Sequence, residues 1–268
     1  MIKMVALDLD GTLLTSDKRI SPRNEAILKH LHQQGVKIVL CTGRPINAIW
    51  KYIEQLELTN DEDYTITFNG ALVIQNVGHH ELFKRGISKQ DLALLHDYSA
   101  DHGYPLDVLD FDQVYPLADL NPSIYQKMLN ANLTFTPTAF PDLADQTYSK
   151  AVMALDPATL DDATTNLTAA MQAQYHTVRS QPQILEFLAA GMDKHVGLSA
   201  LLAHYGWTFD NLMTFGDAEN DLGMLTAAKV GVVMDNGKPE IKAAETHVTG
   251  NNDDDGVAQF LETFDFTK

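Results

Sequence analysis

Short apolar runs alternate with longer segments of helical periodicity at the start of the chain. The apolar runs at 4–7 and 36–41 are each followed by turn residues, which predicts two buried strands. Between them, Ser21 and Pro22 form the cap and first-turn signal of a helix, and Gly35 predicts its end. The chain therefore begins with a strand, a helix and a second strand.

The same alternation continues over the next forty or so residues. A helix is expected at 46–56 and a strand at 65–68. Asn69 and Gly70 form a strong hairpin signal that leads into the apolar run at 71–74. The β-α-β-α-β order up to this hairpin predicts a parallel, doubly wound α/β sheet of the Rossmann-like kind.

The pattern changes between about residues 82 and 188, where most of the prolines occur. Short strands are expected there at 105–109, 149–155, 176–180 and 184–188, and helices at 88–102 and 157–174. Such a mixture of short strands and helices predicts an inserted α+β domain rather than a continuation of the parallel sheet.

Clean alternation of helix and strand returns from Asp193 onward. The expected elements are helices at 194–204 and 221–228, strands at 212–215 and 230–234, and a last helix near the C-terminus. The sequence thus predicts a discontinuous core domain, formed by 1–82 and 190–268, that is interrupted by a second domain at 83–189.

Composition and charge limit the partners of the chain. The 268 residues carry a formal net charge of -17, which argues against nucleic acid and anionic membranes as partners. A phosphorylated substrate would also be repelled at long range, so local cations would have to overcome the field.

Cys41 is the only cysteine, no apolar stretch approaches membrane-spanning length, and the first strand begins almost at once. We therefore expect a cytoplasmic protein without disulfides.

Two acidic residues follow the first predicted strand. Asp8 and Asp10 are one residue apart, and the chain turns at Gly11. In open α/β sheets ligands bind beyond the carboxyl ends of the strands. Two carboxylates placed there repel each other and are costly to desolvate unless a cation or a proton compensates them. This pair therefore predicts a metal-dependent site.

Polar residues at the other strand ends complete a chemically coherent set. Together they supply a nucleophile, a second acid, further metal ligands, a hydroxyl donor and an ammonium group, which is what phosphoryl transfer to a carboxylate needs. Mg²⁺ would screen the anionic nucleophile from the anionic phosphate, which a lysine and backbone amides would also bind. The candidates are Asp8, Asp10, Thr42, Gly43, Lys194, Asp217, Asn220 and Asp221.

The motifs that contain these residues resemble those of the haloacid dehalogenase superfamily, in particular its Cof-type (subclass IIB) phosphatases. The matching segments occur in the family's order and span nearly the whole predicted core. They are 8–13 (DLDGTL), 41–44 (CTGR), 69–70 (NG), Lys194, 216–221 (GDAEND) and 252–258 (NDDDGVA). The resemblance implies a Rossmann-like core, a C2-type cap for the inserted domain, and a Mg²⁺-dependent phosphatase.

The resemblance also implies a role for each candidate. Asp8 attacks phosphorus and forms an aspartyl-phosphate, and Asp10 acts as general acid and then as general base. The implied metal ligands are the Asp8 side chain, the Asp10 main-chain carbonyl and Asp217, with Asp221 ligating directly or orienting the others. The implied phosphate-binding residues are Thr42, Gly43, Lys194 and Asn220.

Some positions depart from the family pattern or allow a simpler interpretation. Asp235 adds a charge where the subfamily usually has glycine, and His195 stands where glycine is more usual. Thr42 could also cap the helix that starts near Pro45, and Asp221 could be a first-turn acid favoured by the helix dipole.

The sequence favours a phosphatase acting on small phosphorylated metabolites such as sugar phosphates, pyridoxal phosphate or flavin mononucleotide. We expect a monomer or a small homo-oligomer. Two alternatives stay open. One is a phosphomutase or phosphotransferase on the same scaffold, and the other is a phospho-accepting receiver-type signalling domain, which also places aspartates, a threonine and a lysine around Mg²⁺. The length of the chain, the inserted domain and Asp10 argue against a receiver.

Overall fold

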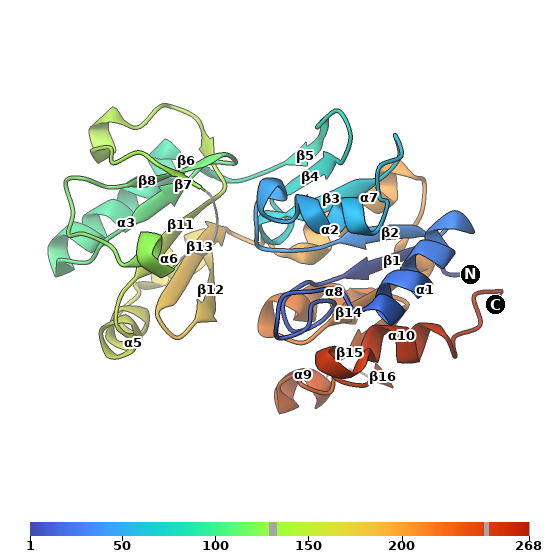
Figure 1. Cartoon of the computed structure of the whole chain (residues 1–268). Helices are drawn as coiled ribbons and strands as arrows, with labels where there is room; N and C mark the ends of the chain where they lie inside the picture. Colours follow the sequence, from blue (N-terminus) through green and yellow to red (C-terminus); the bar gives the residue numbers. More distant parts are fainter. Residues whose placement is uncertain (129–132, 244–246, 268) are drawn as a thin grey trace. The chain divides into compact units, whose positions relative to one another are not determined.

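The computed structural model describes residues 1–128, 133–243 and 247–267, and the chain divides into two compact units (Figure 1). The core unit comprises Met1–Lys84 and Asp193–Lys268, and the inserted unit comprises Arg85–Met192. No helix among the described residues is both long and apolar enough to cross a membrane.

A parallel sheet forms the centre of the core unit. Its strands, in spatial order, are β16 (His247–Val248), β15 (Val230–Val233), β14 (Leu212–Gly216), β1 (Met4–Leu7) and β2 (Lys37–Leu40). Leu7, the last residue of β1, lies opposite Phe215 on one side and Leu40 on the other. The carboxyl ends of these three strands are therefore level. The predicted fold class, a doubly wound α/β core with an α+β insertion, is confirmed.

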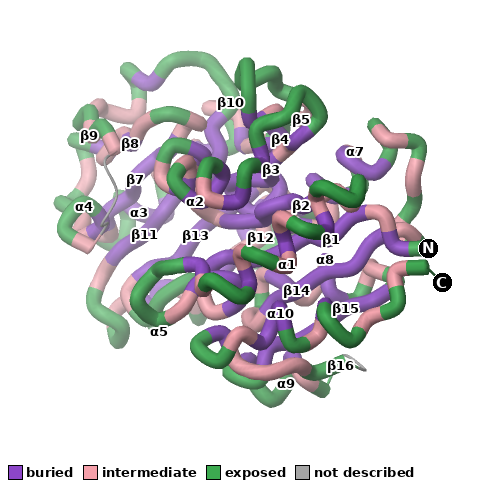
Figure 2. Tube along the Cα trace, turned by 45° about the vertical axis from the view of Figure 1, so that its right-hand side comes forward, coloured by how far each residue is buried: buried purple, intermediate pink, exposed green. Residues whose placement is uncertain are grey.

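Helices cover both faces of this sheet, which explains why its central strands β1 and β14 are buried throughout (Figure 2). On one face α1 (Pro22–Gln33) packs beside α10 (Gly256–Leu261), and on the other α7 (Lys194–His204) packs beside α8 (Leu222–Ala227). The rings of Phe215 and Phe260 lie 5.7 Å apart and join β14 to α10. Two short helices, α2 (Trp50–Gln55) and α9 (Pro239–Ala243), complete the core unit.

The start of α1 follows the sequence signal. The hydroxyl of Ser21 accepts a hydrogen bond from the amide of Asn24 at 3.2 Å, and Pro22 is the first helical residue. The predicted helix at 46–56 is divided, because a 3-10 turn at Ile46–Ala48 precedes α2.

The third predicted strand differs from expectation. β3 (Tyr64–Thr67) pairs antiparallel with β4 (Leu72–Gln75), and β4 pairs with β5 (Glu81–Lys84), so these strands form a separate sheet. A single parallel bridge between Cys41 and Ile66 is recorded between the end of β2 and β3. The hairpin predicted at Asn69-Gly70 is present and pairs β3 with β4, while the contact of β3 with the parallel sheet is limited to the residues just beyond β2.

The inserted unit contains a six-stranded mixed sheet with helices on both faces. Its strands, in spatial order, are β12 (Tyr175–Gln181), β13 (Ile184–Ala189), β11 (Lys150–Ala154), β7 (Asp107–Leu109), β8 (Gln113–Pro116) and β9 (Thr134–Phe135). A separate pair joins β6 (Ile87–Ser88) to β10 (Thr147–Tyr148). The helices are α3 (Lys89–His102), α4 (Tyr125–Met128), α5 (Pro157–Thr165) and α6 (Ala169–Gln174). Residues of α3, α5 and α6 pack with Ala151 and Met153 of the central strand β11, whereas α4 packs with Val152 and Ala154 on the opposite face.

One predicted helix of the inserted unit is broken. The segment at 157–174 forms α5 and α6 rather than a single helix, because Thr168 starts a new helix. Its hydroxyl accepts a hydrogen bond from the amide of Met171 at 3.2 Å, which is the interaction of an N-cap.

The packing of β14 against α10 makes Phe215 a test of the core. Phe215→Ala should lower the free energy of unfolding by about 3–5 kcal/mol, because the buried ring leaves a cavity beside Phe260. Val77→Ala is the matched control, since Val77 is 40% exposed and its loss should change stability by less than about 0.5 kcal/mol. Urea-induced unfolding measures both, and equal effects would contradict this description of the core.

Candidate active site

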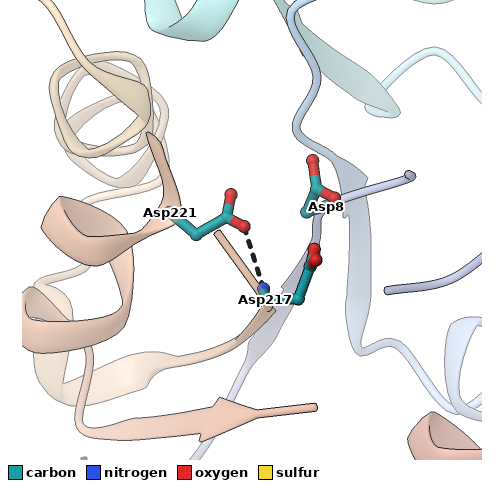
Figure 3. A group of neighbouring side chains, drawn as sticks. All are labelled: Asp8, Asp217 and Asp221. Carbon is teal, nitrogen blue, oxygen red and sulfur yellow. Dashed lines mark hydrogen bonds between the residues drawn. The ribbon is translucent and has the colours of Figure 1, made fainter. Parts of the chain in front are cut away.

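Three carboxylates gather at the carboxyl ends of the central strands (Figure 3). Asp8 follows β1 and Asp217 follows β14, and these strands are adjacent and in register. The amide of Asp8 donates to the carbonyl of Phe215 at 3.0 Å, which continues the ladder past the strand end. Asp221, at the start of α8, completes the group, in which one oxygen from each carboxylate lies within 4.8 Å of the others.

Lys194 ties two of these carboxylates together from the first residue of α7. Its Nζ donates to Oδ1 of Asp8 at 2.5 Å and to Oδ1 of Asp221 at 2.6 Å. The side chain of Lys194 has no exposed area at all. A buried ammonium requires such partners, so the sequence-predicted lysine is fixed by the acids that it neutralises.

Burial and mutual repulsion shift the pKa values of the acids in this cluster. The pKa of Asp8 is raised well above its ordinary value by burial and by the charges of Asp221 and Asp217, although Lys194 acts in the opposite direction. Burial, with the charge of Asp221, raises the pKa of Asp217 to about 6. Burial alone would lower the pKa of Lys194, but Asp221 and Asp8 outweigh it and raise that pKa.

Asp221 is oriented by more than the lysine. Its Oδ2 accepts hydrogen bonds from the amides of Asp217, at 3.0 Å, and Ala218, at 3.1 Å, the first of which is drawn in Figure 3. This carboxylate is therefore engaged on both oxygens, by Lys194 on one side and by the loop that carries Asp217 on the other. The arrangement suits a residue that fixes its neighbours in place.

Gly11 allows the loop after β1 to approach Asp217 closely. Its φ is +86°, and a Cβ at this position would lie 2.5 Å from Oδ2 of Asp217. The next residue, Thr12, donates from its hydroxyl to Oδ1 of Asp217 at 3.1 Å. Thr12 was not among the predicted site residues, although it belongs to the DLDGTL segment.

Asp10 lies in a different environment from Asp8. Its side chain is 40% exposed, and its Oδ1 accepts from Nη2 of Arg44 at 2.5 Å and from Nζ of Lys18 at 2.7 Å. Neither cation was predicted as a site residue. Arg44 could have been suspected from its place in the CTGR segment, whereas nothing in the sequence distinguishes Lys18 from other surface lysines.

Asn69 lies beside three of the predicted site residues, namely Thr42, Gly43 and Asn220. The hydroxyl of Thr42 accepts from the amide of Arg44 at 3.1 Å, so Thr42 closes a turn instead of capping the following helix. A Cβ on Gly43 would lie 3.0 Å from Oδ1 of Asn69, and Nδ2 of Asn220 donates to that oxygen at 3.4 Å. Asn69 was predicted as a turn residue in a segment that resembles the family, and its contact with Asn220 was missed.

The two departures from the family pattern are accommodated locally. The ring of His195 contacts the carboxylate of Asp193, the N-cap of α7, which also accepts from the His195 amide at 2.7 Å. Asp235 forms an exposed ion pair with Lys242 at 2.9 Å. Cys41 is buried beside the site, and burial raises the pKa of its thiol, so it does not supply a thiolate.

Comparisons with known proteins identify the family of the chain. Residues 5–261 match the family model of haloacid dehalogenase-like hydrolases. The chain belongs to this family. The uracil-derivative phosphatase YitU of Bacillus subtilis, which acts on 5-amino-6-(5-phospho-D-ribitylamino)uracil, is 30% identical, with 97% of each chain covered. The HMP-PP phosphatase of Cronobacter sakazakii is also 30% identical, with 97% of this chain and 95% of the relative covered.

The fold is also that of a solved haloacid dehalogenase-like hydrolase. A haloacid dehalogenase-like hydrolase from Bacteroides thetaiotaomicron is similar over 98% of this chain and 99% of its own, with a TM-score of 0.84 and 28% identity. The resemblance to the haloacid dehalogenase superfamily is therefore confirmed, as is the prediction of a hydrolase of the phosphatase type.

The raised pKa of Asp217 gives the metal-free enzyme a distinctive pH dependence. The ordinary value is 3.8 and the folded value is about 6, so between them the folded state holds a proton that the unfolded state releases. The free energy of unfolding should therefore fall as pH rises through this window. Asp217→Asn should remove part of this slope.

Urea-induced unfolding in the presence of a chelator, at several pH values from 4 to 7, measures the effect. Asp235→Asn removes an exposed carboxylate of the same charge and should retain the slope of the parent protein. Identical slopes for the parent and Asp217→Asn would show that Asp217 does not hold the proton.

Proposed function

We propose that the chain is a Mg²⁺-dependent phosphatase that hydrolyses small phosphorylated metabolites through an aspartyl-phosphate on Asp8. The observation that supports this most is the contact of buried Lys194 with Asp8, within a cluster that also contains Asp217 and Asp221. The carboxylate of Asp8 is held at a strand end by one cation, and the acids beside it could bind a second cation. Such a carboxylate is suited to attack an anionic ester.

The reaction consists of two half-reactions on the same phosphorus. In the first, a carboxylate oxygen of Asp8 forms a bond to phosphorus, the bond to the ester oxygen breaks, and Asp10 gives that oxygen a proton. In the second, Asp10 takes a proton from water, the water oxygen bonds to phosphorus, and the bond to Asp8 breaks. Phosphate leaves and both acids return to their starting states.

The donor set fits a hard divalent cation. Three carboxylates stand against one buried ammonium, so the cluster carries excess negative charge, and carboxylate and carbonyl oxygens are the ligands that Mg²⁺ prefers. Asp8, the main-chain carbonyl of Asp10 and Asp217 would hold the ion, with Asp221 ligating or orienting them. The ion would supply charge compensation between nucleophile and phosphate.

Thr42, Gly43, Lys194 and Asn220 form the proposed phosphate-binding side of the site. A hydroxyl, a backbone amide, an ammonium and a side-chain amide are the donors that phosphate oxygens accept. Lys194 already contacts Asp8, so it would lie beside the phosphorus that Asp8 attacks.

The relatives named for defined substrates suggest the substrate class. One acts on a phosphorylated ribitylaminouracil and the other is an HMP-PP phosphatase. We therefore propose a small phosphorylated metabolite as substrate and keep sugar phosphates, pyridoxal phosphate and flavin mononucleotide in the first panel to be assayed. We further propose a cytoplasmic monomer or small homo-oligomer without nucleic-acid or membrane partners.

The inserted unit is proposed to act as the cap that selects the substrate. Three of its polar residues interact within the inserted unit itself. Tyr115 donates to Asp110 at 2.7 Å, and Arg179 donates to Asp161 at 3.1 Å. Asp107 is buried, and burial raises its pKa to about 6, partly offset by a hydrogen bond to Ser123.

A phosphotransferase on the same scaffold would pass the phosphoryl group to an alcohol instead of water. Assays with and without an added acceptor alcohol separate the two, because only the transferase would form a new phosphate ester as the main product. A receiver-type domain would become phosphorylated without sustained release of phosphate.

The proposed nucleophile and acid/base are tested by the variants Asp8→Asn and Asp10→Asn. Asp8→Asn should abolish turnover because the amide is a poor nucleophile, and Asp10→Asn should lower kcat by roughly 10²–10⁴-fold. Phosphate release from a metabolite panel measures both. Asp97→Asn, at an exposed position of α3, is the control and should keep full activity. Retained turnover in Asp8→Asn would exclude Asp8 as the nucleophile.

The metal requirement is tested by chelation and replacement. Treatment with EDTA should stop phosphate release, and added Mg²⁺ should restore it. Mg²⁺ should also raise the melting temperature of the parent protein, because an ion that binds only the folded state stabilises it. Asp217→Ala should lose most of this thermal shift. Activity that is indifferent to chelation would contradict the proposed metal dependence.

A further inference from the structure

A lysine occupies a backbone conformation that favours glycine in the loop between β1 and α1. Lys18 has a φ of +58°. The amide of Thr15 donates to the carbonyl of Arg19 at 2.9 Å, and the amide of Lys18 donates to the carbonyl of Thr15 at 2.8 Å, which forms a tight hairpin. The left-handed position of such a hairpin is usually glycine or asparagine. A lysine is an uncommon residue at such a position, so the contacts of its side chain are of interest.

The hairpin is anchored on two sides. The hydroxyl of Tyr52, a buried residue of α2, donates to the carbonyl of Lys18 at 2.8 Å. The amide and the hydroxyl of Ser16 donate to the two oxygens of Asp253 at 2.7 and 2.6 Å. The backbone that carries the Lys18 side chain is therefore fixed to the core unit.

That side chain ends on the proposed acid/base. Nζ of Lys18 and Nη2 of Arg44 both lie against Oδ1 of Asp10, at 2.7 and 2.5 Å. Within the described ranges, no hydrogen bond to Oδ2 of Asp10 is recorded. Two cationic donors on one oxygen restrict rotation of the carboxylate and leave the other oxygen available.

We propose that Lys18, together with Arg44, is a positioning residue that holds Asp10 with Oδ2 as its proton-transferring oxygen. The inference rests on the proposed function and adds which residues orient the carboxyl group of Asp10. Oδ2 gives its proton to the ester oxygen as the bond from that oxygen to phosphorus breaks. It then takes a proton from the water whose oxygen bonds to phosphorus as the bond to Asp8 breaks.

The leaving group distinguishes positioning of the acid from other effects of Lys18. A p-nitrophenolate ion leaves without a proton, whereas the alkoxide of a sugar needs one, so a misplaced acid slows only the second kind of ester. The ratio kcat/KM reports the half-reaction in which the leaving group departs. Attraction of the phosphate by the lysine would affect both esters alike.

The experiment compares kcat/KM for p-nitrophenyl phosphate and for a hexose phosphate. Lys18→Met keeps the length of the side chain and removes its charge. It should lower kcat/KM about tenfold or more for the hexose phosphate and less than about twofold for p-nitrophenyl phosphate. Lys18→Arg should restore most of the loss because it restores a cationic donor.

Arg19→Met is the matched control. Arg19 is the next residue of the hairpin, it pairs with Asp17, and both side chains are 75% exposed. The substitution removes the same charge from the same loop and should leave both ratios unchanged. Exposed ion pairs add little to stability, so all three variants should melt near the parent temperature.

Equal losses on the two esters, or no loss in Lys18→Met, would overturn the positioning role. Asp10→Asn separates this result from a failure of the proposed function. If Asp10→Asn loses hexose phosphate hydrolysis selectively while Lys18→Met does not, only the inference about Lys18 fails. If Asp10→Asn shows no dependence on the leaving group, or the parent hydrolyses neither ester, the proposed acid/base function fails and the inference fails with it.

Discussion

The buried ion pairs of Lys194 determine how the rest of the site is arranged. A fully buried ammonium is very costly unless carboxylates surround it, and Asp8 and Asp221 do so at 2.5 and 2.6 Å. These contacts connect the end of β1, the start of α7 and the start of α8. One positive charge cannot balance three acids, however, so the same contacts leave an excess of negative charge at the place where a metal ion is proposed to bind.

A second constraint is the charge of the whole chain, which is -17 and would repel an anionic substrate. Screening reduces exposed charges beyond about 8 Å at physiological ionic strength, so nearby groups dominate at the site. Among the residues that the structure describes, Lys18, Arg44 and Lys194 are the cations that contact its acids. Lys18 and Arg44 bind Asp10, and the buried Lys194 binds Asp8. Positive charge therefore lies beside both acids despite the negative charge of the whole chain.

The sequence was most informative where local signals and topology agree. The ends of β1 and β14 were predicted from apolar runs, and parallel pairing then brings Asp8 and Asp217 together. Contacts made by chain reversal could not be predicted in this way. The hairpin that brings Lys18 to Asp10 depends on a left-handed lysine, which is an improbable choice for that position. The sequence likewise did not reveal that β3 would meet the parallel sheet through a single bridge and pair mainly with β4.

The two acids of the DLDGTL segment have the same chemistry and different surroundings, and this difference matches the two tasks proposed for them. Asp8 is buried among like charges and bound by one ammonium, so its anionic form needs cations, and the side chain has little contact with water. Asp10 keeps 40% of its side chain exposed, so it can exchange protons with water and with a leaving oxygen. Gly11 permits the turn that separates these environments, because its left-handed φ carries the loop close against Asp217. The division of labour thus arises from where the strand ends and the turn begins.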